Sequence, residues 1–182
     1  ANSKKRNLAR GEKDKPGEGK PIDSYRVPMK ITSLGEAGEE IETSFLFEFG
    51  EHPNRRPSEA VGDYIVMFGA SGSPHAAEIT EWAKAASRSR QHGETLEKFI
   101  ENNRGSTGTF KGRTDHSFIK KVSSVQDAVA QLLEVEYLGR TEGLLIKPTK
   151  KQVEKLRCNV LKKRNREAHF DSRIERMRVM ME

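Results

Sequence analysis

Cysteine and long apolar runs are scarce in this 182-residue chain. Its one cysteine, Cys158, cannot form a disulfide within the chain, which fits the cytoplasm or another reducing compartment. The longest near-continuous apolar runs, 44–49 and 64–70, are far shorter than the roughly 20 residues that a membrane-spanning helix needs. The charges near the N-terminus are not followed by an apolar stretch, as they would be in a secretory signal peptide. We therefore expect no membrane partner.

Apolar residues are also few for a chain that must build a core. Hydrophobic residues make up 34% of the sequence and charged residues 33%, against roughly 45–50% and 25% in an average globular domain. At this length the chain suits one domain rather than two. The composition predicts a basic extended tail over residues 1–21, an α+β body over 22–148 and a long basic C-terminal helix over 149–182.

Positive charge is concentrated at the two ends. Residues 1–20 carry seven Lys and Arg against three Asp and Glu, and residues 150–182 carry eleven against five, whereas the residues between them have a net charge of −4. Basic ends on an acidic body favour contact with a polyanion, because each phosphate that is neutralised releases a condensed counterion. Charged ends that only keep the protein soluble are the alternative interpretation.

The N-terminal tail is rich in Lys, Gly, Pro and Glu, with Leu8 as its only sizeable apolar residue before position 22. Such a segment cannot bury enough surface to offset the entropy of ordering, so we expect it to be disordered in isolation. Beyond Val27 the sequence changes to a β pattern. A strand over 29–34, two glycines at 35 and 38, and strict alternation over 41–49 predict an antiparallel hairpin.

The rest of the body is expected to alternate between strand and helix. The unbroken apolar run 64–68 predicts a strand covered on both faces, in a central position of the sheet. Ser73-Pro74 and Ser124 with Asp127 are helix-start patterns, and a short helix is expected over 94–103. Residues 134–138 and 143–146 suit either a second hairpin or an extension of the preceding helix. The fold class is therefore α+β, with a small, mostly antiparallel sheet packed with helices.

The predicted C-terminal helix has two apolar patches separated by a cationic stretch, 162–166. The interruption excludes a continuous coiled-coil seam. We expect the first patch to dock on the body and the second to contact a neighbouring protein subunit, through Phe170, Ile174, Met177 and Met181.

No residue pattern points to a metal or a cofactor, and none is predicted. The five histidines are scattered and none has a metal-like spacing to the cysteine. Two weaker signals could support a small enzyme acting on a phosphorylated or nucleic-acid substrate. These are the glycine-containing turn 68–73 between a strand and a helix, and the acid-base pair Asp115-His116. A structural turn and an ordinary loop explain them at least as well, so no catalytic residue is assigned.

Clustered cations are the strongest functional signal. Lys and Arg in these clusters offer point charges and guanidinium groups to phosphate oxygens, and few aromatic residues lie between them to stack on bases. The predicted nucleic-acid-binding residues are Lys4, Lys5, Arg6, Arg10, Arg55, Arg56, Arg104, Lys111, Arg113, Lys162, Lys163, Arg164 and Arg166.

Three classes of function follow in order of preference. The first is a non-enzymatic structural subunit of a large assembly that contains nucleic acid, RNA being favoured over DNA, with low sequence specificity and neighbouring protein subunits as further partners. The second is a virion structural protein or an adaptor that binds other proteins. The third is the small enzyme described above.

Overall fold

The computed structural model describes residues 23–51, 61–68 and 73–155, together with residues 172, 175, 176, 179 and 180. Their order along the chain is β1 (Asp23–Leu34), β2 (Glu40–Glu51), β3 (Val61–Phe68), α2 (Pro74–Gln91), α3 (Leu96–Asn103), β4 (Gly112–Thr114), β5 (Lys121–Val122) and α4 (Val125–Glu136). The strands form one antiparallel sheet in the order β3-β2-β1-β4-β5. The α+β class and the antiparallel sheet are therefore confirmed.

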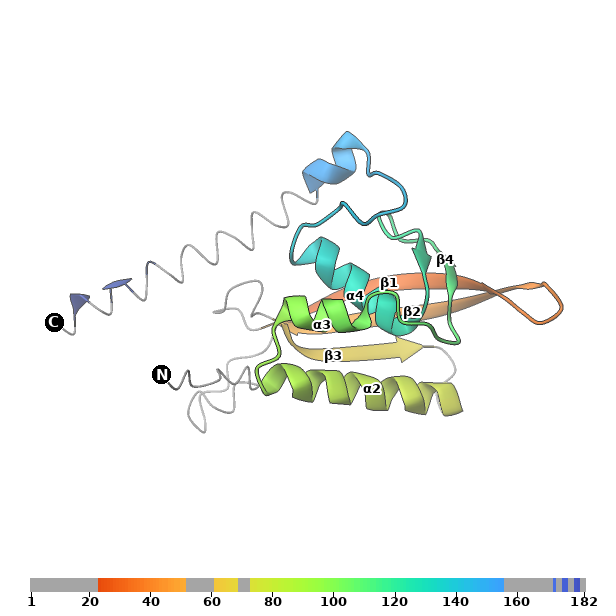
Figure 1. The fold of residues 1–182 in the computed structure, drawn as a ribbon, viewed down its shortest axis with the longest axis horizontal. Helices are drawn as coiled ribbons and strands as arrows, with labels where there is room; N and C mark the ends of the chain where they lie inside the picture. The colour runs from red at the N-terminus through yellow and green to blue at the C-terminus, as the bar shows by residue number, and fades with distance from the viewer. Residues whose placement is uncertain are drawn as a thin grey trace.

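The long β1–β2 hairpin is the spine of the sheet. Its strands pair from Asp23 with Glu51 to Leu34 with Glu40, and its turn places Gly38 at a φ of +84°, a conformation that glycine adopts without strain. One end of the hairpin lies in the body and the other projects beyond the helices (Figure 1). The predicted hairpin is confirmed, and its first strand begins six residues earlier than the sequence pattern indicated.

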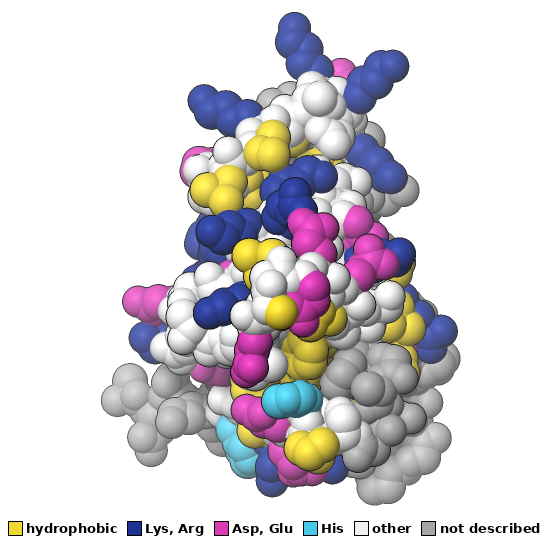
Figure 2. Space-filling view, turned by 90° about the vertical axis from the view of Figure 1, so that its right-hand side faces the viewer, with side chains coloured by type: hydrophobic (Ala, Val, Ile, Leu, Met, Phe, Trp, Pro, Cys, Tyr) yellow, Lys and Arg dark blue, Asp and Glu magenta, His cyan; other side chains and the backbone are white. Residues whose placement is uncertain are grey.

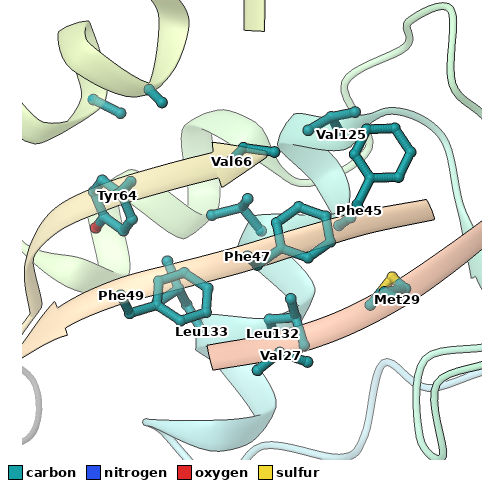
Figure 3. Packing of buried hydrophobic residues seen from close by; sticks show 14 of the residues in the cluster. Val27, Met29, Phe45, Phe47, Phe49, Tyr64, Val66, Val125, Leu132 and Leu133 are labelled. Carbon is teal, nitrogen blue, oxygen red and sulfur yellow. The ribbon is translucent and has the colours of Figure 1, made fainter. Parts of the chain in front are cut away.

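The core lies between one face of this sheet and the helices. Phe45, Phe47 and Phe49 alternate along β2 and are 0–3% exposed, and they point toward α4, where Leu132 and Leu133 are fully buried (Figure 3). Leu96, Phe99 and Ile100 bring α3 into the same cluster. Because every second residue of a strand faces the same side, three phenylalanines spaced by two supply most of the apolar surface of β2.

The prediction of a central position for β3 was wrong, because this strand lies at the edge of the sheet. Tyr64 and Val66 face the core, whereas Ile65 and Met67 are 45% and 44% exposed. Helix α2 runs along the open edge and packs against β3 where a further strand would otherwise lie (Figure 1). The Ser87 hydroxyl accepts the backbone N–H of Tyr64 at 2.9 Å.

The fully buried Arg90 completes this edge. Its Nε and Nη2 atoms donate to the Val61 carbonyl at 3.3 and 3.2 Å, and Nη1 donates to the Glu94 carbonyl. One side chain thereby ties the start of β3 to the turn between α2 and α3. Helix α2 covers the open edge of β3 and supplies the polar contacts of this strand. The sequence of β3 can therefore be as apolar as that of an internal strand, although β3 lies at the edge of the sheet.

The two helix starts are confirmed, since the hydroxyls of Ser73 and Ser124 accept the N–H groups of Ala76 and Asp127. Of the two alternatives for residues 134–146, the helix extension is correct as far as Glu136, and no strand forms there within the described residues. Residues 150–155 are helical, and the long C-terminal helix predicted over 149–182 stays a prediction. The extended tail 1–21 and the cationic stretch 162–166 lie outside the described residues.

Candidate functional site

A cleft of about 600 Å³ lies where the β1–β2 hairpin leaves the body. We call it the β1–β4 cleft. Its walls come from the hairpin, from the loop between α3 and β4, and from β4 and β5 with the residue that follows. The lining residues are Thr32, Ser33, Leu34, Glu40, Thr107, Thr109, Lys111, Gly112, Arg113, Lys121, Val122 and Ser123.

The chemistry of this lining is unbalanced toward hydrogen-bond donors and positive charge. Lys111, Arg113 and Lys121 are exposed cations, and Glu40 is the only acidic residue among the described residues of the lining. Five hydroxyl groups belong to the same set, and that of Ser33 is buried without a hydrogen-bond partner in the described part of the chain. Hydroxyls and cations together are the side chains that most often contact phosphate oxygens.

The buried carboxylate of Asp127, a residue that is 2% exposed, holds the α3–β4 loop in place. Its Oδ1 atom accepts the N–H of Gly105 at 2.9 Å and a hydrogen bond from Arg104 at 3.2 Å. Its Oδ2 atom accepts the N–H of Ser123 at 2.9 Å. One carboxylate therefore fixes both the loop and the residue after β5, and these two segments carry most of the cleft's hydroxyls.

Gly112 sets how closely β4 approaches the hairpin. Its φ is +153°, and a Cβ atom at this position would lie 1.9 Å from the Thr32 carbonyl oxygen. Only glycine fits there, because any side chain would push β4 away from β1. The distance between β4 and β1 therefore depends on having glycine at position 112.

Arg113 and Glu40 form an ion pair across the cleft. Arg113 lies opposite Thr32 in the β1–β4 pairing, whereas Glu40 comes from the far strand of the hairpin. Both side chains are open to water, with exposed fractions of 73% and 59%. An exposed pair of this kind is readily exchanged for another anion.

Positive and negative side chains lie in different areas on the end of the molecule toward which the hairpin projects. Figure 2 shows Lys and Arg side chains gathered over the upper part of this face and Asp and Glu side chains across its middle. The hairpin tip contributes acidic residues, since 35–42 contains Glu36, Glu39, Glu40 and Glu42 and no Lys or Arg. The acidic hairpin tip therefore adjoins a cationic surface.

Of the predicted nucleic-acid-binding residues, Lys111 and Arg113 line the cleft. Arg104 lies beneath it, where its Nε atom is 3.0 Å from Glu134 and its Nη1 atom 3.2 Å from Asp127. Two carboxylates engage its guanidinium, which gives this residue a structural role. The other ten predicted cations and the four predicted interface residues lie outside the described residues.

Sequence reasoning missed several residues of the cleft: Lys121, Glu40 and the hydroxyls of Ser33, Thr107, Thr109 and Ser123. Lys121 is the second of two adjacent lysines and the first residue of the two-residue strand β5, a pattern with no distinguishing signal. Glu40 had no apparent role because its partner is 73 residues away in the chain. Only the pairing of β1 with β4 brings these residues together.

Asp115 and His116, considered above as an acid-base pair, have structural roles. Asp115 accepts the N–H of Lys30 at 2.8 Å, and His116 Nδ1 accepts the N–H groups of Phe118 and Ile119 at 3.3 and 3.2 Å. Burial lowers the pKa of His116 to about 4, and the charge of Lys120 acts in the same direction. A neutral imidazole that accepts two backbone hydrogen bonds holds the loop before β5 in shape.

Tyrosine and glutamate side chains meet at the other end of the sheet, near the last residues of β2 and α4. The Tyr137 hydroxyl donates to Glu51, and burial together with this carboxylate raises the pKa of Tyr137 well above its ordinary value. Burial, followed by the charge of Glu136, raises the pKa of Tyr25 to about 12. Both phenols therefore remain neutral donors to carboxylates at physiological pH.

A second groove, of about 700 Å³, runs between β3 and α2. Its lining mixes both signs of charge, with Asp63 and Glu81 beside Lys84 and Arg88. Lys84 is already paired with Glu81 at 2.7 Å. This groove lacks the excess of cations that distinguishes the β1–β4 cleft.

Neither metal-binding nor membrane-spanning features occur in the part of the chain that the structure describes. Those residues contain no group of three or more His, Cys, Asp or Glu side chains that could hold a metal ion. Their helices are also too short or too polar to cross a bilayer.

The chain matches no protein-family model, no curated protein and no solved structure.

Proposed function

We propose that this protein is a non-enzymatic structural subunit of a nucleic-acid-containing assembly, and that it binds a phosphate backbone through the β1–β4 cleft and its basic ends. One observation carries the proposal: the described lining of the cleft has three exposed cations and five hydroxyls against a single carboxylate. Cations supply the salt-dependent part of nucleic-acid affinity, and hydroxyls add directional hydrogen bonds to phosphate oxygens.

Low sequence specificity follows from what the lining omits. No aromatic residue is among the described residues that line the cleft, so bases have no surface on which to stack. RNA is favoured over DNA because the exposed hydroxyls of Thr107 and Thr109 can exchange hydrogen bonds with a 2′-hydroxyl as well as with a phosphate. The backbone, rather than the bases, is the part of the ligand that such a cleft can recognise.

The test is binding of the full chain to a fluorescein-labelled oligouridine, measured by anisotropy over a series of salt concentrations. The triple variant Lys111→Gln, Arg113→Gln, Lys121→Gln should bind more weakly. Its slope of log affinity against log salt should fall by up to about 0.7 for each phosphate of a single strand that is no longer neutralised.

The matched control is the triple variant Lys84→Gln, Arg88→Gln, Lys98→Gln. These residues lie on α2 and α3, are exposed and carry the same total charge, but they lie outside the cleft. If the two triple variants lose affinity equally, general electrostatic attraction explains binding and the cleft has no special role. If the wild-type chain does not bind at low salt, the proposed function itself is wrong.

A protein-binding adaptor, such as a virion component, is the second candidate, and the hairpin tip favours it. Leu34 is 74% exposed and Ile41 is 47% exposed on the part of the hairpin that projects beyond the helices (Figure 1). Exposed apolar side chains suit a protein surface, and the carboxylates around them would repel a polyanion. If Leu34→Ser and Ile41→Ser dissociate an oligomer that the cleft variants leave intact, the adaptor function is favoured.

A further inference from the structure

The Arg113–Glu40 pair joins the cleft to the acidic hairpin tip. Three cations are among the described residues that line the cleft, and of these only Arg113 forms an ion pair with another lining residue. Glu40 is the only carboxylate in that described lining. The site therefore contains its own anion, held on the guanidinium that suits a phosphate best, since arginine presents two parallel N–H donors to carboxylate and phosphate alike.

We infer that Glu40 is the specificity-determining residue of the cleft, because its carboxylate competes with an incoming phosphodiester for Arg113. This inference rests on the proposed function. A ligand must displace Glu40 to use Arg113, and the displaced carboxylate then stays close to the bound phosphate and repels it. The cleft consequently discriminates against weakly charged ligands and against single anions, which can reach only one cation, and favours a chain whose neighbouring phosphates also reach Lys111 and Lys121.

Solvent exposure sets the size of the effect. Both partners are more than half exposed, and exposed ion pairs contribute little to stability because water competes for both charges. Removing the carboxylate should therefore strengthen binding by about two- to fivefold rather than by orders of magnitude. Freeing Arg113 for one more phosphate should also steepen the salt dependence on a single strand by about 0.7.

A neighbouring pair on the hairpin provides the control. Glu42 lies two residues beyond Glu40 on β2 and pairs with Lys30 at 2.8 Å, with exposed fractions of 49% for the lysine and 55% for the glutamate. Neither residue lines the cleft. Glu42→Gln thus removes the same charge from the same strand and breaks a similarly exposed pair, without freeing Arg113.

The experiment measures oligouridine binding by the full-length wild type and by Glu40→Gln, Glu42→Gln, Arg113→Gln and the double variant Glu40→Gln, Arg113→Gln. Thermal melting confirms that each variant is folded. We expect Glu40→Gln to bind about two- to fivefold more tightly than the wild type and more tightly than Glu42→Gln. In the Arg113→Gln background, Glu40→Gln should strengthen binding no more than Glu42→Gln does, because there is no guanidinium left to release.

Each other outcome overturns a defined claim. Equal increases in affinity from Glu40→Gln and Glu42→Gln, or an increase from Glu40→Gln that persists without Arg113, would reduce Glu40 to one surface charge among many. If neither Glu40→Gln nor Arg113→Gln changes the affinity, Glu40 does not compete with RNA for Arg113 and the RNA binds elsewhere. If no protein in the series binds at low salt, the proposed function fails and the role of Glu40 fails with it.

Discussion

Arg104 and Asp127, which are 23 residues apart, are joined by an ion pair of 3.2 Å beneath the β1–β4 cleft. The aspartate is buried, and the same oxygen atom also accepts the N–H of Gly105. A charge buried in this way needs its partners, because without them it is desolvated and unpaired. The shape of the cleft loop is therefore coupled to the stability of the whole fold.

Replacing Asp127 by Asn should lower the free energy of unfolding by about 2–4 kcal/mol, since the amide cannot accept all the bonds that the carboxylate accepts. Urea denaturation measures the change. Asp115→Asn is the control, because Asp115 is exposed and accepts the N–H of Lys30. Its cost should be about 1 kcal/mol or less. Similar losses of stability for the two variants would contradict the role given to Asp127.

Gly112→Ala should destabilise the protein more than Gly38→Ala does. Both glycines have positive φ, but a Cβ atom at Gly38 meets nothing within 4 Å, whereas one at Gly112 would lie 1.9 Å from the Thr32 carbonyl oxygen. Gly38→Ala should cost only the backbone strain, about 1–2 kcal/mol. Gly112→Ala must also separate β4 from β1, and hydrogen exchange should accelerate at Asp115, whose N–H donates to the Lys30 carbonyl of β1. Equal costs would show that the close approach is absent in solution.

All three tyrosines should resist ionisation in the folded protein. Burial is the leading cause of the raised pKa at Tyr25, Tyr64 and Tyr137, and the value for Tyr25 is about 12. Since the ordinary value is about 10, the unfolded chain binds fewer protons between pH 10 and 12 than the folded chain does. Stability is therefore lost as the pH rises through that window.

Near-ultraviolet absorbance of tyrosinate measures this difference. At a pH near 10 the chain in urea should be about half ionised, and the folded chain should show almost no tyrosinate. Tyr25→Phe should remove the earliest of the folded-state transitions. Ionisation of the folded protein with a midpoint near 10 would show that these phenols are accessible to solvent.

His116 should titrate at unusually low pH, because burial lowers its pKa to about 4. The unfolded chain, with a histidine pKa near 6.5, binds more protons between those two values, so stability falls as the pH falls from 6.5 toward 4. NMR of the imidazole ring protons measures the midpoint, and His116→Gln assigns the signal among the five histidines. His92→Gln, at an exposed position, is the control and should leave that signal in place. A midpoint near 6.5 for His116 would contradict its burial.

Local sequence predicted the elements whose signals lie within one segment. The alternation of Phe45, Phe47 and Phe49 specified a strand with one buried face, and the glycines at 35 and 38 specified its turn, because both depend on neighbouring residues alone. Ser124 with Asp127 specified a helix start for the same reason. The charges of the two ends can be read from composition, although their partners cannot.

Tertiary structure decided the rest, since it depends on residues that the chain brings together from afar. The apolar run of β3 cannot indicate whether its second neighbour is a strand or a helix, and here Ser87 and Arg90 of α2 supply the polar contacts of the open edge. Asp127 reads as a capping residue, yet it also organises a loop 22 residues earlier. The β1–β4 cleft exists only because antiparallel pairing sets Arg113 beside Thr32 and within reach of Glu40. Residue types determined what each segment can bind, and strand pairing determined which of them share a site.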